Sequence, residues 1–404
     1  MKTAEFRGFA LVRTLPYASV VIYLDNNAST ALAGEVLAAM MPYLEATFGN
    51  ASSAHSAGRA ARVGIEDARA HVAALVGAEY PSEVVFTSGG TESIWTALHM
   101  AREEGRAPRY VISAVEHAAV FDAARAFARP DGQVIAVPVS RTGALDLDAL
   151  DDALLGGPAV VSLMLANNET GVISSLEHAL PIIRRRGALL HVDAVQAAGK
   201  IPVDVQRIGC DYLSISAHKF HGPKGTGAVY VRRNAPRNAF IGGTHEGGLR
   251  GGTENVAAIV GLGAAARAAL RDLDTEMSRT AALRDRIEAA LLSSIEGADV
   301  NGDRTARVAN TTSVYIPQCD AATLVENLSA RGVCVSSGAA CSTGRKASHV
   351  ILAMGHSERR ANSSLRISLS KFNTAAEIDR AAAILQETVA ATVRLPGGQA
   401  RRPE

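Results

Sequence analysis

One lysine, one carboxylate and one glycine-rich turn are the residues of this 404-residue chain best suited to chemistry. Lys219 stands in "SISAHKFHGPKGTG", Asp193 in "HVDAVQ", and Thr91 follows Gly89 and Gly90 in "SGGTES". A lysine amine forms a Schiff base with an aldehyde, a carboxylate keeps a pyridine nitrogen protonated, and a helix N-terminus with nearby hydroxyls binds phosphate. Together these residues predict chemistry based on pyridoxal phosphate.

These residues follow short apolar segments that read as β-strands. The strand candidates are residues 83–87 "EVVFT", 109–114 "RYVISA", 159–165 "AVVSLML", 188–192 "ALLHV", 212–216 "YLSIS" and 227–231 "GAVYV". In an open α/β sheet, ligands bind beyond the carboxyl ends of the strands. Five strand candidates are followed there by polar residues, and we expect one site assembled from Thr91, His117, Asn168, Asp193, Gln196, His218 and Lys219.

Taken singly, each of these residues also has an ordinary structural role. Asp193 suits the N-cap of a following helix, and Lys219 suits a solvated surface position. His117 alone fits a packed or surface imidazole, and Gly89 with Gly90 fits a simple turn. These roles do not explain why the residues occur at successive strand ends, so the joint site is the simpler interpretation.

Composition limits the class of protein. Of the residues, 48% are hydrophobic and 20% are charged, a composition that predicts a globular protein. The formal net charge of +1 indicates no electrostatic preference for nucleic acid or a membrane. Its four cysteines, Cys210, Cys319, Cys334 and Cys341, contain no CxxC pair and fit neither a disulfide framework nor a zinc site. The N-terminal stretch is too interrupted for a membrane span. We therefore expect a cytoplasmic protein without an intrinsic metal.

Strand candidates alternate with alanine-rich helical stretches, which predicts a parallel sheet covered by helices. Beyond about residue 261 the pattern changes to a long Ala/Arg/Leu helix, a strand "NTTSVYI", a helix near "TLVENLSARG" and the Gly/Ser-rich "SSGAACSTG". This change predicts a second, smaller domain.

Ten ordered motifs resemble the NifS/IscS-like cysteine desulfurases, which are pyridoxal phosphate enzymes of the class V aminotransferase family. They are "YLDNNAST", "FGNASSAHSAGR", "VVFTSGGTES", "VEHAAV", "ANNETGVI", "HVDAVQAAGK", "SISAHKFHGPKGTGAVYVR", "GGLRGGTENV", "SSGAACSTG" and "LRISLS". The resemblance implies an α/β fold of type I. Its large domain has a mostly parallel seven-stranded sheet flanked by helices, and a smaller α+β domain follows. We expect residues 1–30 to pack with the small domain, residues 31–265 to bind the cofactor, and residues 266–404 to carry the Cys341 loop.

The resemblance also implies a role for each site residue. Lys219 carries the Schiff base, Asp193 pairs with the pyridine nitrogen, Gln196 binds the ring hydroxyl, and His117 stacks on the ring. The predicted phosphate ligands are Gly90, Thr91, Ser216 and His218, with Thr253 reaching the site of the neighbouring subunit in a homodimer. Asn168 contacts the cofactor and, together with Arg366, binds the substrate carboxylate.

Cys341 matches the position of the family nucleophile, in a Gly/Ser-rich segment typical of exposed loops. The implied reaction converts L-cysteine to L-alanine and transfers sulfur to Cys341 as a persulfide, with His117 relaying a proton. A sulfur-acceptor protein then serves iron–sulfur cluster assembly or another thio-modification pathway. Cys341 can also act as a transient iron–sulfur ligand.

Two other functions stay open at this point. A selenocysteine lyase or another class V enzyme keeps Lys219 and Asp193, although the cysteine loop disfavours an aminotransferase or a kynureninase-like hydrolase. A non-catalytic sulfur-transfer scaffold is disfavoured because both the lysine and the thiol are present. The sequence leaves undetermined the acceptor, any accessory activator, the preference between cysteine and selenocysteine, and the role of the first 20 or so residues.

Overall fold

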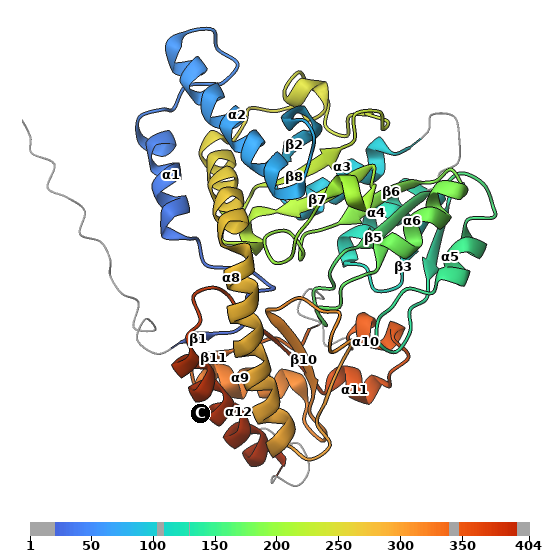
Figure 1. Ribbon diagram of the computed structural model, residues 1–404, viewed down its shortest axis with the longest axis vertical. Coiled ribbons are helices and arrows are strands. Elements are labelled where there is room, and N and C mark those ends of the chain that lie inside the picture. Colours follow the sequence, from blue (N-terminus) through green and yellow to red (C-terminus); the bar gives the residue numbers. More distant parts are fainter. Residues whose placement is uncertain (1–20, 103–108, 129, 339–346, 394–404) are drawn as a thin grey trace, which may run out of the picture.

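The structure is a computed structural model that describes residues 21–102, 109–128, 130–338 and 347–393. Figure 1 shows two regions, a larger one built on a helix-covered sheet and a smaller one around β10 and α12, with the long helix α8 running along both.

The larger region is built on a seven-stranded sheet with the strand order β2-β8-β7-β6-β5-β3-β4. Its strands are β2 (Val84–Thr87), β3 (Arg109–Ser113), β4 (Gln133–Val137), β5 (Val160–Met164), β6 (Leu189–Asp193), β7 (Tyr212–Ser216) and β8 (Gly227–Val231). All pairings from β4 to β7 are parallel, whereas β8 runs antiparallel to β2 and β7. The predicted mostly parallel sheet is therefore confirmed, and the six predicted strands lie within one residue of their observed ends. The sequence missed β4, an edge strand with little burial along most of its length.

Side chains along each strand point alternately to the two faces, because the side-chain period of a strand is two residues. Val111 faces a core formed with α2 and α8, whereas its neighbours Tyr110 and Ile112 face a core formed with α3 and α4. The helices of this region are α1 (Gly34–Glu45), α2 (Ser56–Val76), α3 (Gly90–Met100), α4 (Ala118–Ala128), α5 (Leu147–Ala153), α6 (Leu176–Arg185), α7 (Val205–Ile208) and the first part of α8 (Val256–Ser294).

The smaller region has its own core. A three-stranded antiparallel sheet joins β12 (Ser364–Ser368), β10 (Thr311–Tyr315) and β9 (Asp299–Val300), and β1 (Ile22–Tyr23) pairs in parallel with β11 (Val333–Cys334). The helices of this region are α9 (Ala321–Ala330), α10 (His349–Ala353), α11 (Glu358–Asn362) and α12 (Ala375–Val393). Leu24 from the N-terminal segment packs into the same core as Leu365 and Leu385.

The predicted domain boundary at residue 265 falls inside α8, which is continuous from residue 256 to 294. The helix contributes Leu262 to the core of the larger region and Ile287 to the core of the smaller one. One rigid element thus belongs to both regions, and the predicted division stays a prediction.

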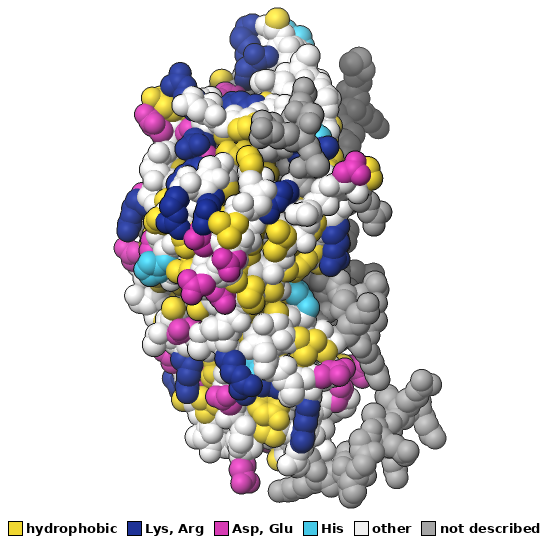
Figure 2. Space-filling view, turned by 90° about the vertical axis from the view of Figure 1, so that its right-hand side faces the viewer, with side chains coloured by type: hydrophobic (Ala, Val, Ile, Leu, Met, Phe, Trp, Pro, Cys, Tyr) yellow, Lys and Arg dark blue, Asp and Glu magenta, His cyan; other side chains and the backbone are white. Residues whose placement is uncertain are grey.

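The surface carries both signs of charge. On the face drawn in Figure 2, basic and acidic side chains of the described residues are interspersed, in keeping with the net charge of +1. No helix in the described part of the chain combines the length and apolar character that a membrane span needs.

Candidate active site

The carboxyl ends of β5, β6 and β7 open into a cavity of about 350 Å³. Ten of the twelve predicted site residues line it, namely Gly90, Thr91, His117, Asn168, Asp193, Gln196, Ser216, His218, Lys219 and Arg366. The structure brings these residues together at one cavity, because parallel strands carry the residues that follow them to the same edge of a sheet.

The other two predicted residues lie elsewhere. Thr253 lines a separate cavity of about 230 Å³ together with Ser88 and Thr226, so it does not face Lys219 of its own chain. Its role toward a neighbouring subunit stays a prediction. Cys341 lies outside the described residues.

Lys219 ends a short helical turn, Ala217–Lys219, that follows β7 directly. Its Nζ donates hydrogen bonds to the backbone oxygens of Asn27, at 2.7 Å, and Ala28, at 3.0 Å. Two fixed acceptors hold the amine at the cavity wall, where it is available to a carbonyl group bound there.

Asp193 is the last residue of β6 and is 4% exposed. Its Oδ1 accepts a hydrogen bond from the backbone N–H of Val195 at 2.9 Å. Burial raises the pKa of Asp193, while the charges of His117 and Lys219 oppose that rise. A cationic ring nitrogen beside this carboxylate would add to the charges that oppose the rise in its pKa, because an opposite charge favours the ionised form.

A buried hydrogen-bonded chain lies next to Asp193 on the same sheet. His191 Nδ1 is 2.8 Å from Ser162 Oγ, and His191 Nε2 is 2.9 Å from Ser214 Oγ. Burial lowers the pKa of His191 to about 3, so this imidazole is neutral at physiological pH. These hydrogen bonds fix side chains on three adjacent strands without adding charge beneath the cavity.

The glycine-rich turn leads into α3. Gly89, with φ 154°, is the N-cap of the helix, and an added Cβ on Gly90 would lie 2.9 Å from a methyl group of Val195. The neighbouring Ser216 hydroxyl is buried and makes no hydrogen bond within the described part of the chain. A helix N-terminus beside an unpartnered hydroxyl is suited to an anion such as phosphate.

His218 completes this end of the cavity. Burial, followed by the charges of Lys219 and two other lysines, lowers the pKa of His218 to about 4. A neutral imidazole can donate to one phosphate oxygen without a compensating counterion.

Asn27 connects the two regions through its side chain and backbone. Its backbone oxygen accepts from Gln196 Nε2 at 2.9 Å as well as from Lys219. Its side-chain Nδ2 donates to Thr311 Oγ1 at 2.9 Å, and its Oδ1 accepts from Lys200 Nζ at 2.9 Å. A single buried asparagine thereby joins the sheet, the lysine turn and the smaller region.

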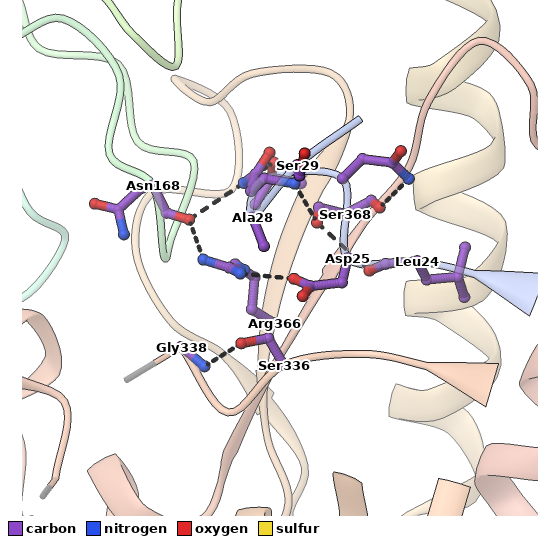
Figure 3. Close-up of polar contacts among 12 residues, drawn as sticks. Leu24, Asp25, Ala28, Ser29, Asn168, Ser336, Gly338, Arg366 and Ser368 are labelled. Atoms are coloured by element: carbon purple, nitrogen blue, oxygen red, sulfur yellow. Dashed lines mark hydrogen bonds and ion pairs between the residues drawn. The ribbon is translucent and has the colours of Figure 1, made fainter. Parts of the chain in front are cut away.

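Arg366 enters the cavity from β12 and is 4% exposed. In Figure 3 its guanidinium lies between the Asp25 carboxylate and the backbone oxygen of Asn168. Nη2 donates to Asp25 Oδ1 at 2.7 Å and Nη1 to the Asn168 oxygen at 3.0 Å, while Nε is buried without a partner among the described residues. A guanidinium has five N–H groups, so donors remain for a substrate carboxylate.

His117 and Glu116 follow β3. His117 Nδ1 accepts a hydrogen bond from the backbone N–H of Ala119 at 3.2 Å, which places the proton of the neutral ring on Nε2. Glu116 is fully buried, and its Oε1 accepts from the backbone N–H of Met164 at 2.6 Å. Burial, with a smaller contribution from Asp193, raises the pKa of Glu116 well above its ordinary value.

The sequence reasoning missed Asn27, which lines the cavity, and three residues that contact lining residues: Asp25, Glu116 and Lys200. Asp25 and Asn27 belong to "YLDNNAST", where two amides follow a carboxylate after a short strand, a polar run that signals a ligand-facing turn. Glu116 and Lys200 each occur inside motifs that were recognised for a neighbouring residue. Their long-range partners carry no local signal.

The residues fit pyridoxal phosphate. The orphan Ser216 hydroxyl and the α3 N-terminus suit its phosphate, Asp193 suits its ring nitrogen, and the Lys219 amine suits its aldehyde.

Comparison with known proteins agrees with this geometry. Residues 22–381 match the aminotransferase class-V family. A cysteine desulfurase of Cereibacter sphaeroides is 45% identical over 372 residues, which cover 91% of this chain and 95% of that protein. A solved NifS-like protein superposes with a TM-score of 0.85 at 36% identity, covering 92% of this chain and all of that one. A structure described as SspA in complex with cysteine gives a TM-score of 0.76 at 30% identity, covering 87% and 99%. The chain belongs to the aminotransferase class-V family, among its cysteine desulfurases.

Proposed function

We propose that this chain is a pyridoxal phosphate-dependent enzyme that converts L-cysteine to L-alanine and transfers the sulfur atom to Cys341. The observation that carries the proposal is the single cavity shared by a lysine amine, a buried carboxylate, an anion cradle and a buried arginine. The names of the relatives support the same substrate and reaction.

Pyridoxal phosphate, when bound, supplies an electron sink that makes the bonds to the substrate Cα and Cβ easier to break. Asp193 and Gln196 would hold its ring, His117 would stack on it, and Lys219 would hold its aldehyde carbon. Gly90, Thr91, Ser216 and His218 would hold its phosphate, with Asn168 at the ring side of the cavity.

The remaining steps belong to side chains of the protein. The Arg366 guanidinium, with Asn168, binds the carboxylate of L-cysteine and orients the substrate. The Lys219 amine moves the Cα proton. His117 relays a proton between its ring and the substrate thiol. The Cys341 thiolate attacks the substrate sulfur, so the C–S bond breaks as an S–S bond forms. One cysteine and one enzyme thiol thus yield one alanine and one enzyme persulfide.

The assembly and the destination of sulfur are also part of this proposal. In a homodimer, Thr253 would complete the phosphate site of the neighbouring subunit, and a sulfur-acceptor protein would receive the persulfide sulfur. A cytoplasmic location and a role in iron–sulfur cluster assembly stay predictions.

Two variants test the cofactor role and the sulfur role separately. Lys219→Ala should lose the borohydride-reducible attachment of pyridoxal phosphate. Cys341→Ser should keep the absorbance of bound pyridoxal phosphate but lose alanine formation by at least about 10³-fold, because a hydroxyl offers almost no anion at neutral pH. Cys319→Ala, a substitution of a buried cysteine in the smaller region, is the matched control and should remain active. Persulfide mapped to another cysteine, or alanine formation at the wild-type rate by Cys341→Ser, would contradict the proposal.

A further inference from the structure

Lys200 is a second lysine close to the site, and the proposed function assigns it no role. It follows Gln196 by four residues and does not line the cavity that holds Lys219, Asp193 and Arg366. Instead it lines a smaller neighbouring cavity of about 70 Å³, which Lys219 also borders. Lys200 is therefore placed to act on the site through the residues between them.

The Nζ group of Lys200 forms hydrogen bonds with two side-chain amides. Its Nζ donates to Gln196 Oε1 at 2.5 Å and to Asn27 Oδ1 at 2.9 Å. None of the ion pairs formed by the described residues includes Lys200. Two hydrogen bonds from one donor nitrogen therefore constrain both amides.

These contacts decide which way the Gln196 amide points. Lys200 Nζ donates its hydrogen bond to Gln196, so the atom of Gln196 that faces Lys200 is the oxygen. The Nε2 group then donates to the backbone oxygen of Asn27 at 2.9 Å, and Gln196 lines the active-site cavity. The backbone oxygen of Asn27 favours the same orientation, because it can only accept, and Lys200 adds a second constraint on the other end of the amide.

Burial and two neighbouring positive charges act against the ionised form of Lys200. Desolvation lowers the pKa of Lys200 well below its ordinary value, and the positive charges of Lys219 and Arg366 lower it further. A group held in this way against two like charges, with amide oxygens as its acceptors, is costly to retain for packing alone.

We propose that Lys200 is a positioning residue that holds the Gln196 amide with its N–H toward the ring oxygen of pyridoxal phosphate. The proposal rests on the proposed function, because it assigns Gln196 the same ring contact. It adds a residue that touches neither substrate nor cofactor and acts only through Gln196 and Asn27.

A double-mutant cycle tests whether Lys200 acts through Gln196. Protein freed of cofactor is titrated with pyridoxal phosphate, and the absorbance of the bound cofactor reports both affinity and its change with pH. Lys200→Met and Gln196→Ala should each weaken binding by about tenfold, because Gln196→Ala removes the hydrogen bond to the ring oxygen and Lys200→Met removes the contact that orients it. The double variant should bind within about twofold of Gln196→Ala alone, because residues that act as one unit are not additive. The pH at which the absorbance changes should move equally in the two single variants.

Lys371→Met is the matched control. Lys371 borders the same cavity of about 70 Å³ but lies 4.0 Å from Glu35 and 3.9 Å from Asp272, so its removal should leave the affinity for pyridoxal phosphate unchanged. If Lys200→Met does not fold, Gln196→Glu keeps the partner oxygen of Lys200 and removes the donor, and the same loss of affinity is expected.

Each contrary result has a distinct meaning. Additive losses in the double variant, about 100-fold in total, would overturn the role of Lys200 and leave the proposed function standing. Wild-type affinity in Gln196→Glu would overturn the role of Lys200 together with the ring contact of Gln196, but not the proposed reaction. A wild-type protein that takes up no pyridoxal phosphate would overturn both.

Discussion

The two walls of the active-site cavity are held in place by different means. On the sheet side, Asp193 and Ser216 are strand-end residues, 4% and 1% exposed, with strand neighbours that are themselves buried. On the other side, Arg366 is equally buried, but its two partners, Asp25 and the Asn168 backbone, come from distant parts of the chain.

This difference separates two tasks. Side chains at the ends of buried parallel strands vary little in position, which suits groups that must match the cofactor closely. An arginine held by contacts between regions can move when those contacts change, which suits substrate entry and release. We therefore expect substitutions on the sheet side to alter turnover and spectrum, and substitutions around Arg366 to alter substrate affinity.

The largest effect should come from the sheet side, at Asp193. Asp193→Asn should reduce kcat by at least about 10²-fold and alter the absorbance of bound pyridoxal phosphate, because a neutral amide cannot keep the ring nitrogen protonated. KM for L-cysteine should change much less. A near-normal kcat would mean that Asp193 only caps the turn at Val195.

Although Asp193→Asn should impair turnover, it should not lower the thermal stability of the protein without cofactor. The folded-state pKa of Asp193 is raised, so the wild-type protein without cofactor loses stability as pH rises from about 4 through that raised pKa. Asp193→Asn removes this loss. Its thermal unfolding temperature at pH 7, measured without cofactor, should therefore equal or exceed that of the wild type.

An intermediate effect is expected at Arg366. Arg366→Lys should raise KM for L-cysteine by about tenfold to 100-fold with a smaller change in kcat, because an ammonium group cannot replace the two-pronged contact with a carboxylate. Asp25→Asn provides the paired test. It removes the carboxylate that competes for Nη2, so KM should fall. A rise in KM for Asp25→Asn would show instead that Asp25 serves mainly to orient the arginine.

The smallest effect should be at Glu116, which lies beneath the sheet-side wall. Because burial raises its pKa in the folded state, its contribution to the free energy of unfolding declines as pH rises above about 4.5. Glu116→Gln removes the titration and keeps an oxygen acceptor for the Met164 N–H. The difference in unfolding free energy between this variant and the wild type should grow in favour of the variant as pH rises from 5 to 8. Parallel pH profiles for the two proteins would argue against a raised pKa.

Sequence patterns were informative where structure is local. The strands from β5 to β8 have compact apolar cores with β-branched residues, so their positions were predicted to within a residue, whereas the largely unburied edge strand β4 left no comparable pattern. The ten cavity residues were found because each follows a strand or belongs to a recognisable motif. Cys341 lies outside the described residues, so its place relative to Lys219 stays a prediction.

The sequence by itself determined the sheet, the residue types at its carboxyl edge and the family, because all three depend on short-range patterns of hydrophobicity and on ordered motifs. Only the tertiary structure decided how those residues are held. The bond between Lys200 and Asn27 spans 173 positions of the chain, and the one between Asp25 and Arg366 spans 341. Contacts at such separations arise from tertiary packing, and no local spacing encodes which amide a lysine will meet or which carboxylate an arginine will share.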